Sequence, residues 1–582
     1  MKSIKYFSIL SGALVALSLN SCSESFLDHV PDERTEIDTE EKVVNLLKSS
    51  YPTANYCWIA ELSSDNLIDN QAPHLPTKPW DKQILTHYNY SSYDRWDDQL
   101  YKFDPATIAG FNDYDSPGMI WTGFYGSVAS CNAALDALEK IKAEKGVETA
   151  VMRAARAEAL LIRAYDHFCL VNMFSQAYKD AERSRNDIGI PYVTEMENVV
   201  QKEYQRSNVA EVYDKIQADL EEGLANLDEI IYTVPKWHFN LNAAHAFAAR
   251  FYLYKREWAK VVEHANAVLG TDNNSLMNMM MDYSVFTDCS TGDEYSLAWQ
   301  NPSQNNNLML ISTNSLLYRR SFGYRYSYAG PPARDIFLIN AHHPFWSSYY
   351  ACPIAMVSGM LFSSSTHDYG FINSKIFEQF EYSDKIARIG FPHIIHRAFT
   401  ANELLLERAE AKLMLGQTDA AAEDLCAYWN NSIDRFSEAD YKSYYESGYI
   451  KYITKNMIVN WYSNPDNGNC HANWDFTQRN ISPSYVISAE QVPFMNCLNE
   501  FRRFETMFEG LRFFDLKRWG VEWEHTVSVN ADAYTLSGND ARRAIEVPWE
   551  VISAGLESSR VVPSSSANSN QLVFDKEDFK IK

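Results

Sequence analysis

Aromatic side chains within polar, turn-rich segments are the residues of this sequence most suited to binding chemistry. Phe, Tyr and Trp make up 14% of the 582 residues. Flat rings held on loops can stack on the apolar faces of sugar rings, while neighbouring Asn, Asp, Gln and Arg side chains hydrogen-bond to hydroxyls. The competing interpretation of each ring is a position in the hydrophobic core. We select as candidate ligand contacts Trp80, Trp96, Tyr283, Trp299, Tyr324, Tyr326 and Trp346.

A second candidate is the segment Asn499–Gly520, which combines rings with arginines. Its apolar residues from Phe501 to Leu511 recur at three- and four-residue steps, which places them on one face if the segment is a helix. Arginine beside aromatic rings can grip a carboxylate or a phosphate. Acidic residues lie close enough in the segment to satisfy those cations instead. We therefore interpret it as a core helix locked to the scaffold by internal ion pairs of Arg512, Asp515 and Arg518.

Signals for catalysis, metals and cofactors are weak. The sequence has no phosphate loop, no dinucleotide-binding fingerprint and no G-x-S-x-G turn. His393 and His396 lack the glutamate of a zinc-protease helix, so we interpret them as ordinary histidines. A glycosidase needs two carboxyl groups about 5 to 10 Å apart in space, a separation that a sequence does not reveal. We expect no enzyme activity, no metal and no cofactor, and a surface glycosidase remains an alternative.

The charge of the chain excludes one class of partner. With 52 basic and 76 acidic side chains the formal net charge is −24. Binding to nucleic acid requires clustered positive charge, because phosphates must be neutralised. Purely electrostatic adhesion to anionic lipid is disfavoured for the same reason.

The first 22 residues have the features of an export signal. Lys2 and Lys5 precede a short apolar run, which ends in Leu19-Asn20-Ser21-Cys22. That ending resembles the bacterial lipobox, in which the cysteine is acylated and becomes the first residue of the mature protein. We expect residues 1–21 to be removed and Cys22 to be lipidated, so that acyl chains hold the protein at a membrane.

Helices must position the candidate rings. Apolar residues with helical spacing predict helices over 42–50, 121–138, 151–174 and 209–227. Two further segments, 243–269 and 403–429, each divide into a pair of helices, with turns near 255–257 and at 416–417. Between and after these pairs, we predict long irregular, aromatic-rich loops over 271–392 and 432–492. The fold class predicted is therefore all-α.

The last two helix pairs are similar to tetratricopeptide repeats, in which small and large residues alternate so that hairpins stack into a right-handed superhelix. Ala409, Gly416, Ala421 and Leu425 fall where that pattern needs small, turn, small and large residues, whereas Val261 departs from it. We expect a superhelical scaffold of such hairpins that carries the loops.

Several motifs together resemble the SusD/RagB family of outer-membrane nutrient-binding lipoproteins. They include Phe26-Leu27-Asp28 after Cys22, Asn132-Ala133, Gly189-Ile190-Pro191, and the run from Glu509 to Trp519, which is the most specific of them. The resemblance covers nearly the whole mature chain. Val547-Pro548-Trp549 departs from the Pro-Ile-Pro turn common in such proteins.

The resemblance implies a signal over 1–21, an N-terminal region over 22–235 and a C-terminal region over 236–582, packed as one unit. It also implies a non-catalytic, cell-surface protein that delivers a glycan to a SusC-like TonB-dependent transporter in the outer membrane. Because the family has no fixed ligand motif, no binding residue is transferred by position. Peptide binding on the same scaffold is the closest alternative.

Overall fold

The computed structural model describes residues 36–69, 94–197, 203–321, 325–328, 359–364, 367–435, 446–448, 451–463, 486–527 and 532–560; for 359–373 it describes the backbone alone. Among these residues, no helix combines the length and the apolar character needed to span a bilayer. Cys22 lies outside the described residues, so its lipidation stays a prediction.

The predicted N-terminal helices are confirmed. They are α3 (Glu40–Lys48), α6 (Pro117–Lys145), α7 (Ala150–Phe174) and α8 (Val209–Asn226). Capping side chains fix where they begin: Ser116 Oγ accepts the Met119 N–H at 3.1 Å, and Asn208 Oδ1 accepts the Glu211 N–H at 2.9 Å. Such caps satisfy backbone donors that a helix leaves unpaired at its first turn.

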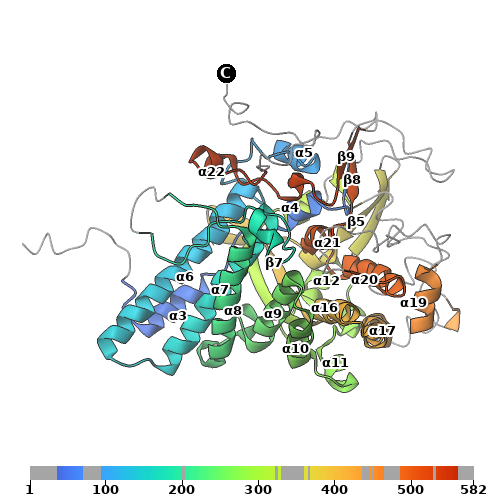
Figure 1. Cartoon of the computed structure of the whole chain (residues 1–582), viewed down its shortest axis with the longest axis horizontal. Coiled ribbons are helices and arrows are strands. Elements are labelled where there is room, and N and C mark those ends of the chain that lie inside the picture. Colours follow the sequence, from blue (N-terminus) through green and yellow to red (C-terminus); the bar gives the residue numbers. More distant parts are fainter. Residues whose placement is uncertain are drawn as a thin grey trace, which may run out of the picture.

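Both predicted helical hairpins are also present, and they pack on each other through α10 and α16. The first is α9 (Leu241–Lys255) with α10 (Trp258–Leu269), and the second is α16 (Ala401–Met414) with α17 (Thr418–Arg435). The small residues Ala249, Ala409 and Ala421 are fully buried, which allows close helix contact. Figure 1 shows α6 to α10, α16 and α17 side by side in chain order. The right-handed superhelix stays a prediction.

The segment 271–392 differs from the predicted irregular loop, because it holds helices and most of the strands. Its strand β2 (Asn307–Asn314) pairs antiparallel with β7 (Ile389–Thr400), which also pairs with β6 (Gln379–Asp384), giving the order β2-β7-β6. Strands far apart in the chain cannot be paired from local patterns. The other elements here are α11 (Asn273–Met279), η5 (Tyr283–Phe286), α12 (Gly292–Trp299), α13 (Leu317–Ser321), β3 (Tyr326–Ser327), β4 (Gly359–Ser364), β5 (His367–Asn373) and η8 (Ser374–Ile376).

The segment Asn499–Gly520 is two helices rather than one. Helix α20 (Val492–Glu505) ends before Phe508 and Gly510, whose φ angles are +58° and +77°, and α21 (Leu511–Trp519) then starts in a new direction. The predicted internal ion pairs are confirmed, and they reach further than expected. Arg512 Nε donates to Asp65 at 2.7 Å, and Arg518 pairs with both Asp515 and Glu410.

The remaining described elements are short. Near the N-terminus lie α4 (Cys57–Leu62), β1 (Ile68–Asp69) and α5 (Arg95–Tyr101). The others are η2 (Arg183–Asn186), η3 (Glu229–Ile231), η4 (Pro235–Trp237), α19 (Lys455–Tyr462), β8 (Trp523–Val527), β9 (Asp532–Leu536), η10 (Ala541–Arg543) and α22 (Trp549–Ser553).

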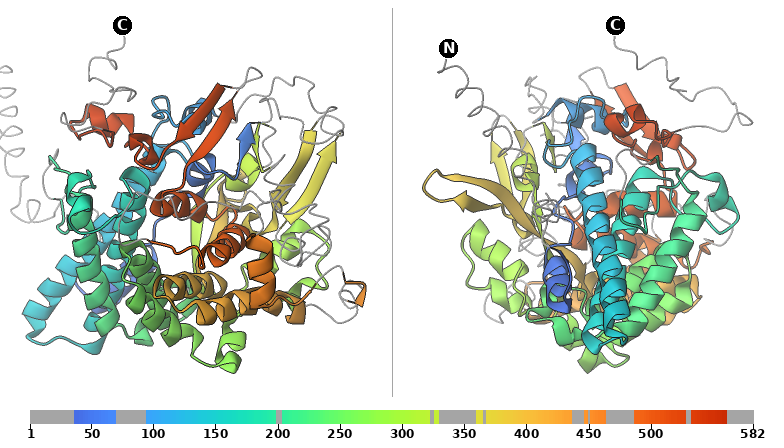
Figure 2. Two further views of the ribbon diagram at one scale, coloured as in Figure 1. Left: turned by 45° about the vertical axis from the view of Figure 1, so that its right-hand side comes forward. Right: turned by 90° about the vertical axis from the view of Figure 1, so that its left-hand side faces the viewer.

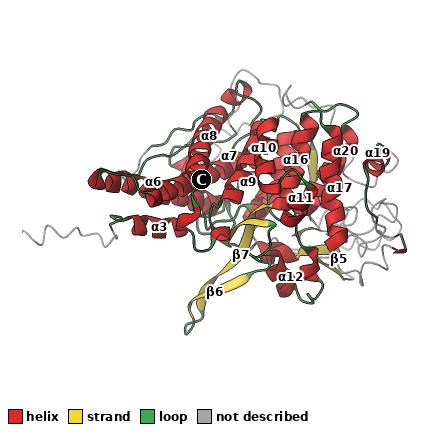
Figure 3. Ribbon diagram, turned by 90° about the horizontal axis from the view of Figure 1, so that it is seen from below, coloured by secondary structure: helices red, strands yellow, loops and turns green. Residues whose placement is uncertain are grey.

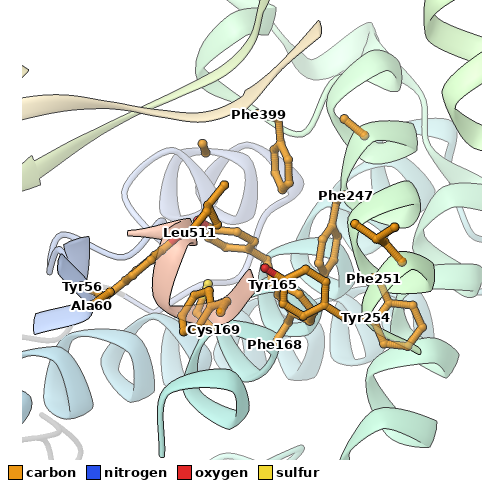
Figure 4. Close-up of a cluster of buried hydrophobic side chains, with 14 of the residues drawn as sticks. Tyr56, Ala60, Tyr165, Phe168, Cys169, Phe247, Phe251, Tyr254, Phe399 and Leu511 are labelled. Carbon is orange, nitrogen blue, oxygen red and sulfur yellow. The ribbon is translucent and has the colours of Figure 1, made fainter. Parts of the chain in front are cut away.

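The hydrophobic core joins residues from both sides of position 235. Tyr165 of α7 meets Phe247 of α9 and Phe399 of β7, each with ring centroids 5.7 Å apart. Figure 4 shows these rings converging with Leu511 of α21. The helices and the sheet are therefore held by shared packing, and they provide a rigid support for the surface.

Candidate ligand-binding surface

Four of the seven candidate rings lie in the described residues, and all four are buried. Trp96 and Tyr326 are 2% exposed, and Tyr283 and Trp299 are fully buried. A ring can stack on a sugar only if one of its faces is accessible. In this structure these rings serve as core residues, and a ligand would have to displace their neighbours to reach them. Trp80, Tyr324 and Trp346 lie outside the described residues, so the prediction for them stands.

Trp96 belongs to a buried polar network that fastens α5 to α13. The Arg320 guanidinium lies 4.7 Å from the Trp96 ring centroid and pairs with Asp94 at 2.7 Å, with Asp97 at 3.2 Å and with Asp115 at 3.1 Å. Several partners for one buried cation offset the cost of taking it out of water. The network holds the chain rigidly at residue 94, immediately after the segment 70–93 that contains Trp80.

Tyr283 and Trp299 contact side chains of η8, β7 and α16. Arg397 and Lys375 lie over the Trp299 ring at 4.7 and 5.0 Å, and the Tyr283 hydroxyl accepts a 3.3 Å hydrogen bond from Asn402. Trp299 thus stacks on cations of the protein itself, a favourable buried arrangement that leaves no face for a ligand.

The structure brings together the anchors of two aromatic segments. β1 and β3 pair antiparallel, with Asp69 opposite Tyr326. The segment 70–93, with Trp80, starts after Asp69, and Tyr324 stands two residues before Tyr326. The candidates Trp80 and Tyr324 therefore belong to segments that leave the scaffold at one place.

Partly exposed polar groups surround this place. The Arg325 guanidinium approaches Asp98 at 3.0 Å and Asp69 at 3.4 Å, and the Tyr326 hydroxyl donates to Asp98 at 2.8 Å. The side chains of Arg325 and Asp98 are 17% and 31% exposed. They can offer hydrogen bonds to a ligand held by rings of the adjoining segments. We define the convergence surface as the partly exposed Asp98 and Arg325, which contact the buried Asp69 and Tyr326.

A cleft of about 710 Å³ lies elsewhere, between α6, residues 191–197 and 203–205, and the end of α22. Trp121 and Tyr125 line it beside Glu195, Glu197 and Glu203, and Tyr125 donates to the Pro191 carbonyl at 2.8 Å. No local sequence pattern predicts this cleft, because its walls come from three segments that are distant in the chain. Its described lining carries carboxylates and no Lys or Arg.

Two carboxyl groups with a raised pKa, those of Glu61 and Asp97, are not catalytic candidates. Burial raises the pKa of Glu61 and that of Asp97 to about 7 each. A raised pKa suits a general acid, but a general acid must reach its substrate. Both side chains are fully buried and engaged within the protein: Asn66 donates to Glu61 at 2.8 Å, and Trp58 Nε1 donates to Asp97 at 2.9 Å. Their positions are structural.

The histidines of the sequence H-I-I-H lie on β7, and His396 is buried. Within the described part of the chain, no group of three or more His, Cys, Asp or Glu side chains is arranged to hold a metal ion.

This architecture, a row of helices carrying a small sheet and long connections, is shared with solved structures. A SusD superfamily protein from Bacteroides thetaiotaomicron is 15% identical, with a TM-score of 0.54 over 90% of this chain and 100% of the other. One from Bacteroides vulgatus is 18% identical, with a TM-score of 0.55 over 90% and 99%. A SusD-like carbohydrate binding protein from Bacteroides vulgatus is 15% identical, with a TM-score of 0.50 over 91% and 99%.

Residues 25–253 match the model of a SusD-like family described as starch-binding and associating with the outer membrane. A comparison with curated proteins finds no match. Residues 25–253 are thus similar to the SusD-like family, and the chain shares its fold with solved SusD superfamily structures.

Proposed function

We propose that this chain captures glycans at the outer membrane and passes them to a SusC-like TonB-dependent transporter. The family is described as starch-binding, and one protein of the same fold is a carbohydrate binding protein. The observation that carries the proposal is the β1–β3 pair, which anchors two aromatic segments at one place. Rings from both segments can then stack on one oligosaccharide, while Arg325 and Asp98 read its hydroxyls.

Membrane attachment is supplied by Cys22 in this proposal. Acyl chains contribute about 0.8 kcal/mol per buried methylene. Attachment through the N-terminus leaves the convergence surface available to ligand and transporter.

Calorimetry tests the binding step directly. The chain beginning after Cys22 is titrated with malto-oligosaccharides and with a panel of other neutral oligosaccharides. We expect saturable binding of at least one glycan, weakened by Arg325→Met. The matched control is Arg183→Met, since Arg183 is exposed and lies on η2, outside the convergence surface. Absence of binding to every glycan, with binding of basic peptides instead, would favour the peptide alternative.

The alternative that the protein is a glycosidase is tested by a separate measurement of product formation. The bound oligosaccharide is incubated with the protein and the products are separated by chromatography. We expect no shorter product. A product that disappears on substitution of a single carboxylate would establish a glycosidase and overturn this part of the proposal.

A further inference from the structure

The β6–β7 hairpin carries an unusual concentration of exposed apolar side chains. Phe380 is 43% exposed, Tyr382 49%, Ile386 97% and Ile389 61%. Figure 3 shows the hairpin standing out from the body of the molecule, and β6 is exposed along most of its length. Exposed apolar residues gathered at one place mark an interaction surface, because water is a poor solvent for them.

The turn of the hairpin presents Ile386 outward. Asp384 Oδ1 accepts the N–H groups of Ile386 at 2.8 Å and Ala387 at 2.9 Å, and Arg388 takes a φ angle of +55°. Both bonds lie within the turn itself. Ile386 is therefore held at the tip by local geometry.

An aromatic layer lies behind the tip. The rings of Phe380 and Tyr382 pack edge to face, with centroids 5.0 Å apart. Gly390 opposes Tyr382 in the ladder, and a Cβ there would lie 2.7 Å from Phe380 Cε1 and 2.0 Å from the Glu381 carbonyl oxygen. Glycine at 390 therefore allows the β6 backbone and the ring of Phe380 to approach β7 this closely.

The side chains are ordered along the hairpin as a lipid–water interface requires. An isoleucine occupies the tip, the cations Lys385 and Arg388 flank it, and an aromatic pair follows. In a bilayer surface the apolar tip enters the acyl region, long cationic side chains extend to the headgroups and aromatic rings lie at that level. Glu381 and Asp384 balance the two cations, so the contact depends on apolar insertion.

We propose that the β6–β7 hairpin inserts its tip into the membrane surface and gives the protein a second membrane contact. The lipid anchor at Cys22 belongs to the proposed function, on which this inference rests in part. α3, the first described helix, and the hairpin lie on the same side of α6 in Figure 2 (right) and Figure 3. A fully extended chain from Cys22 to Glu36 could reach at most on the order of 45 Å, so the lipid anchor is not confined to the immediate surroundings of α3.

The second contact fixes how the protein is oriented. A single flexible anchor leaves the body free to rotate above the membrane, whereas two separated contacts restrict that rotation. The orientation of the ligand-binding surface toward the membrane plane then follows from the fold.

The experiment attaches the protein to vesicles without its lipid. A hexahistidine tag replaces Cys22, and the mature chain is bound to phosphatidylcholine vesicles that contain a nickel-chelating lipid. Trypsin cleaves after Lys385 and Arg388, and mass spectrometry gives the rate. We expect cleavage at these two sites to be about tenfold slower on vesicles than after release with imidazole, because cleavage follows the population of the non-inserted tip. Cleavage after the exposed Arg185 serves as the internal reference.

Two variants make the test specific. Ile386→Glu places a charge at the tip and should abolish the protection, without loss of folding because the side chain is 97% exposed. Ile230→Glu, at a residue 57% exposed on η3, should keep it. Equal cleavage with and without vesicles, or equal protection of Ile386→Glu, would overturn the proposal. Protection that appears only when the purified transporter is added would overturn it in favour of a protein contact. Glycan binding measured by calorimetry on the same protein separates this failure from failure of the proposed function.

Discussion

Arg502 of α20 and Asp515 of α21 form a bidentate ion pair, with Nε to Oδ2 at 2.7 Å and Nη2 to Oδ1 at 3.1 Å, and neither side chain is exposed. Arg518 Nε also donates to Asp515 at 2.8 Å. One carboxylate thus binds Arg502 across the break between the helices and Arg518 within α21. This geometry identifies Asp515 as the centre of the C-terminal ion-pair system.

Substitution of Asp515 by Asn should strongly destabilise the protein. It leaves the buried Arg502 guanidinium without its counter-charge and removes one of the two carboxylate partners of Arg518, which costs about 3 to 5 kcal/mol. We expect a lower midpoint of urea unfolding, with the m-value unchanged. Asp136→Asn is the control, because its pair with Lys140 is exposed and contributes less than about 1 kcal/mol. Equal shifts for the two variants would contradict the assignment.

Two glycines with similar backbone angles should respond differently to alanine. Gly510 (φ +77°) would place a Cβ 3.0 Å from Cys57 Cα and 2.8 Å from the Tyr56 ring, whereas Gly416 (φ +74°) faces open space. We expect Gly416→Ala to cost about 1 to 2 kcal/mol, the price of a left-handed conformation for a residue with a Cβ. Gly510→Ala should cost clearly more, because backbone must also move. Thermal unfolding of the two variants, side by side, measures the difference.

His167 should make stability fall in acid. It accepts the Val193 N–H at Nε2 (3.1 Å), Nδ1 bonds to the Arg163 carbonyl (2.8 Å), and burial lowers its pKa to about 3. Between pH 6.5 and 3, His167 of the unfolded chain binds a proton that the folded protein does not bind. The stability that neutral His167 contributes above pH 6.5 therefore falls by about 1.4 kcal/mol for each pH unit in this range.

The check is the free energy of unfolding as a function of pH for the protein and for His167→Phe. The variant should be less stable at pH 7, because the Val193 N–H loses its acceptor, and its stability should decline less steeply between pH 6 and 4. An unchanged slope would mean that His167 does not stay neutral in the folded protein.

Substitutions of two candidate tryptophans should have different effects, one on folding stability and the other on glycan binding. Trp299→Ala empties a buried site between Arg397 and Lys375 and should cost about 3 to 5 kcal/mol of stability. Trp80→Ala should leave the melting temperature unchanged and weaken glycan binding about tenfold, equivalent to about 1.4 kcal/mol. Thermal unfolding and calorimetry on both variants distinguish the two roles. Lost stability in Trp80→Ala together with unchanged stability in Trp299→Ala would contradict this assignment.

The helical part of the fold follows from local signals. Capping residues such as Asn208, the helical spacing in α6 to α8 and the turn at Gly416 all act within a few residues, so the sequence displays them. The break at Phe508 was missed because a non-glycine residue rarely takes a positive φ angle.

The sheet and the burial of the rings depend on distant partners. β2 pairs with β7 across the chain, and Arg320 finds Asp94 and Asp97 more than 220 residues away. Such partners decide whether a loop ring is buried, and periodicity carries no information about them. The exposed Phe380 and Tyr382 were missed although their two-residue spacing and the following turn predict a hairpin.

The ion pair between Arg512 and Asp65 joins residues 447 positions apart. During synthesis, the N-terminal part of the chain lacks this partner until almost the whole protein has been made. Asp65 and its neighbours therefore complete their native contacts only at the end of translation. In the export that we propose, the chain crosses a membrane in an unfolded state, and this late completion would help to keep it in that state.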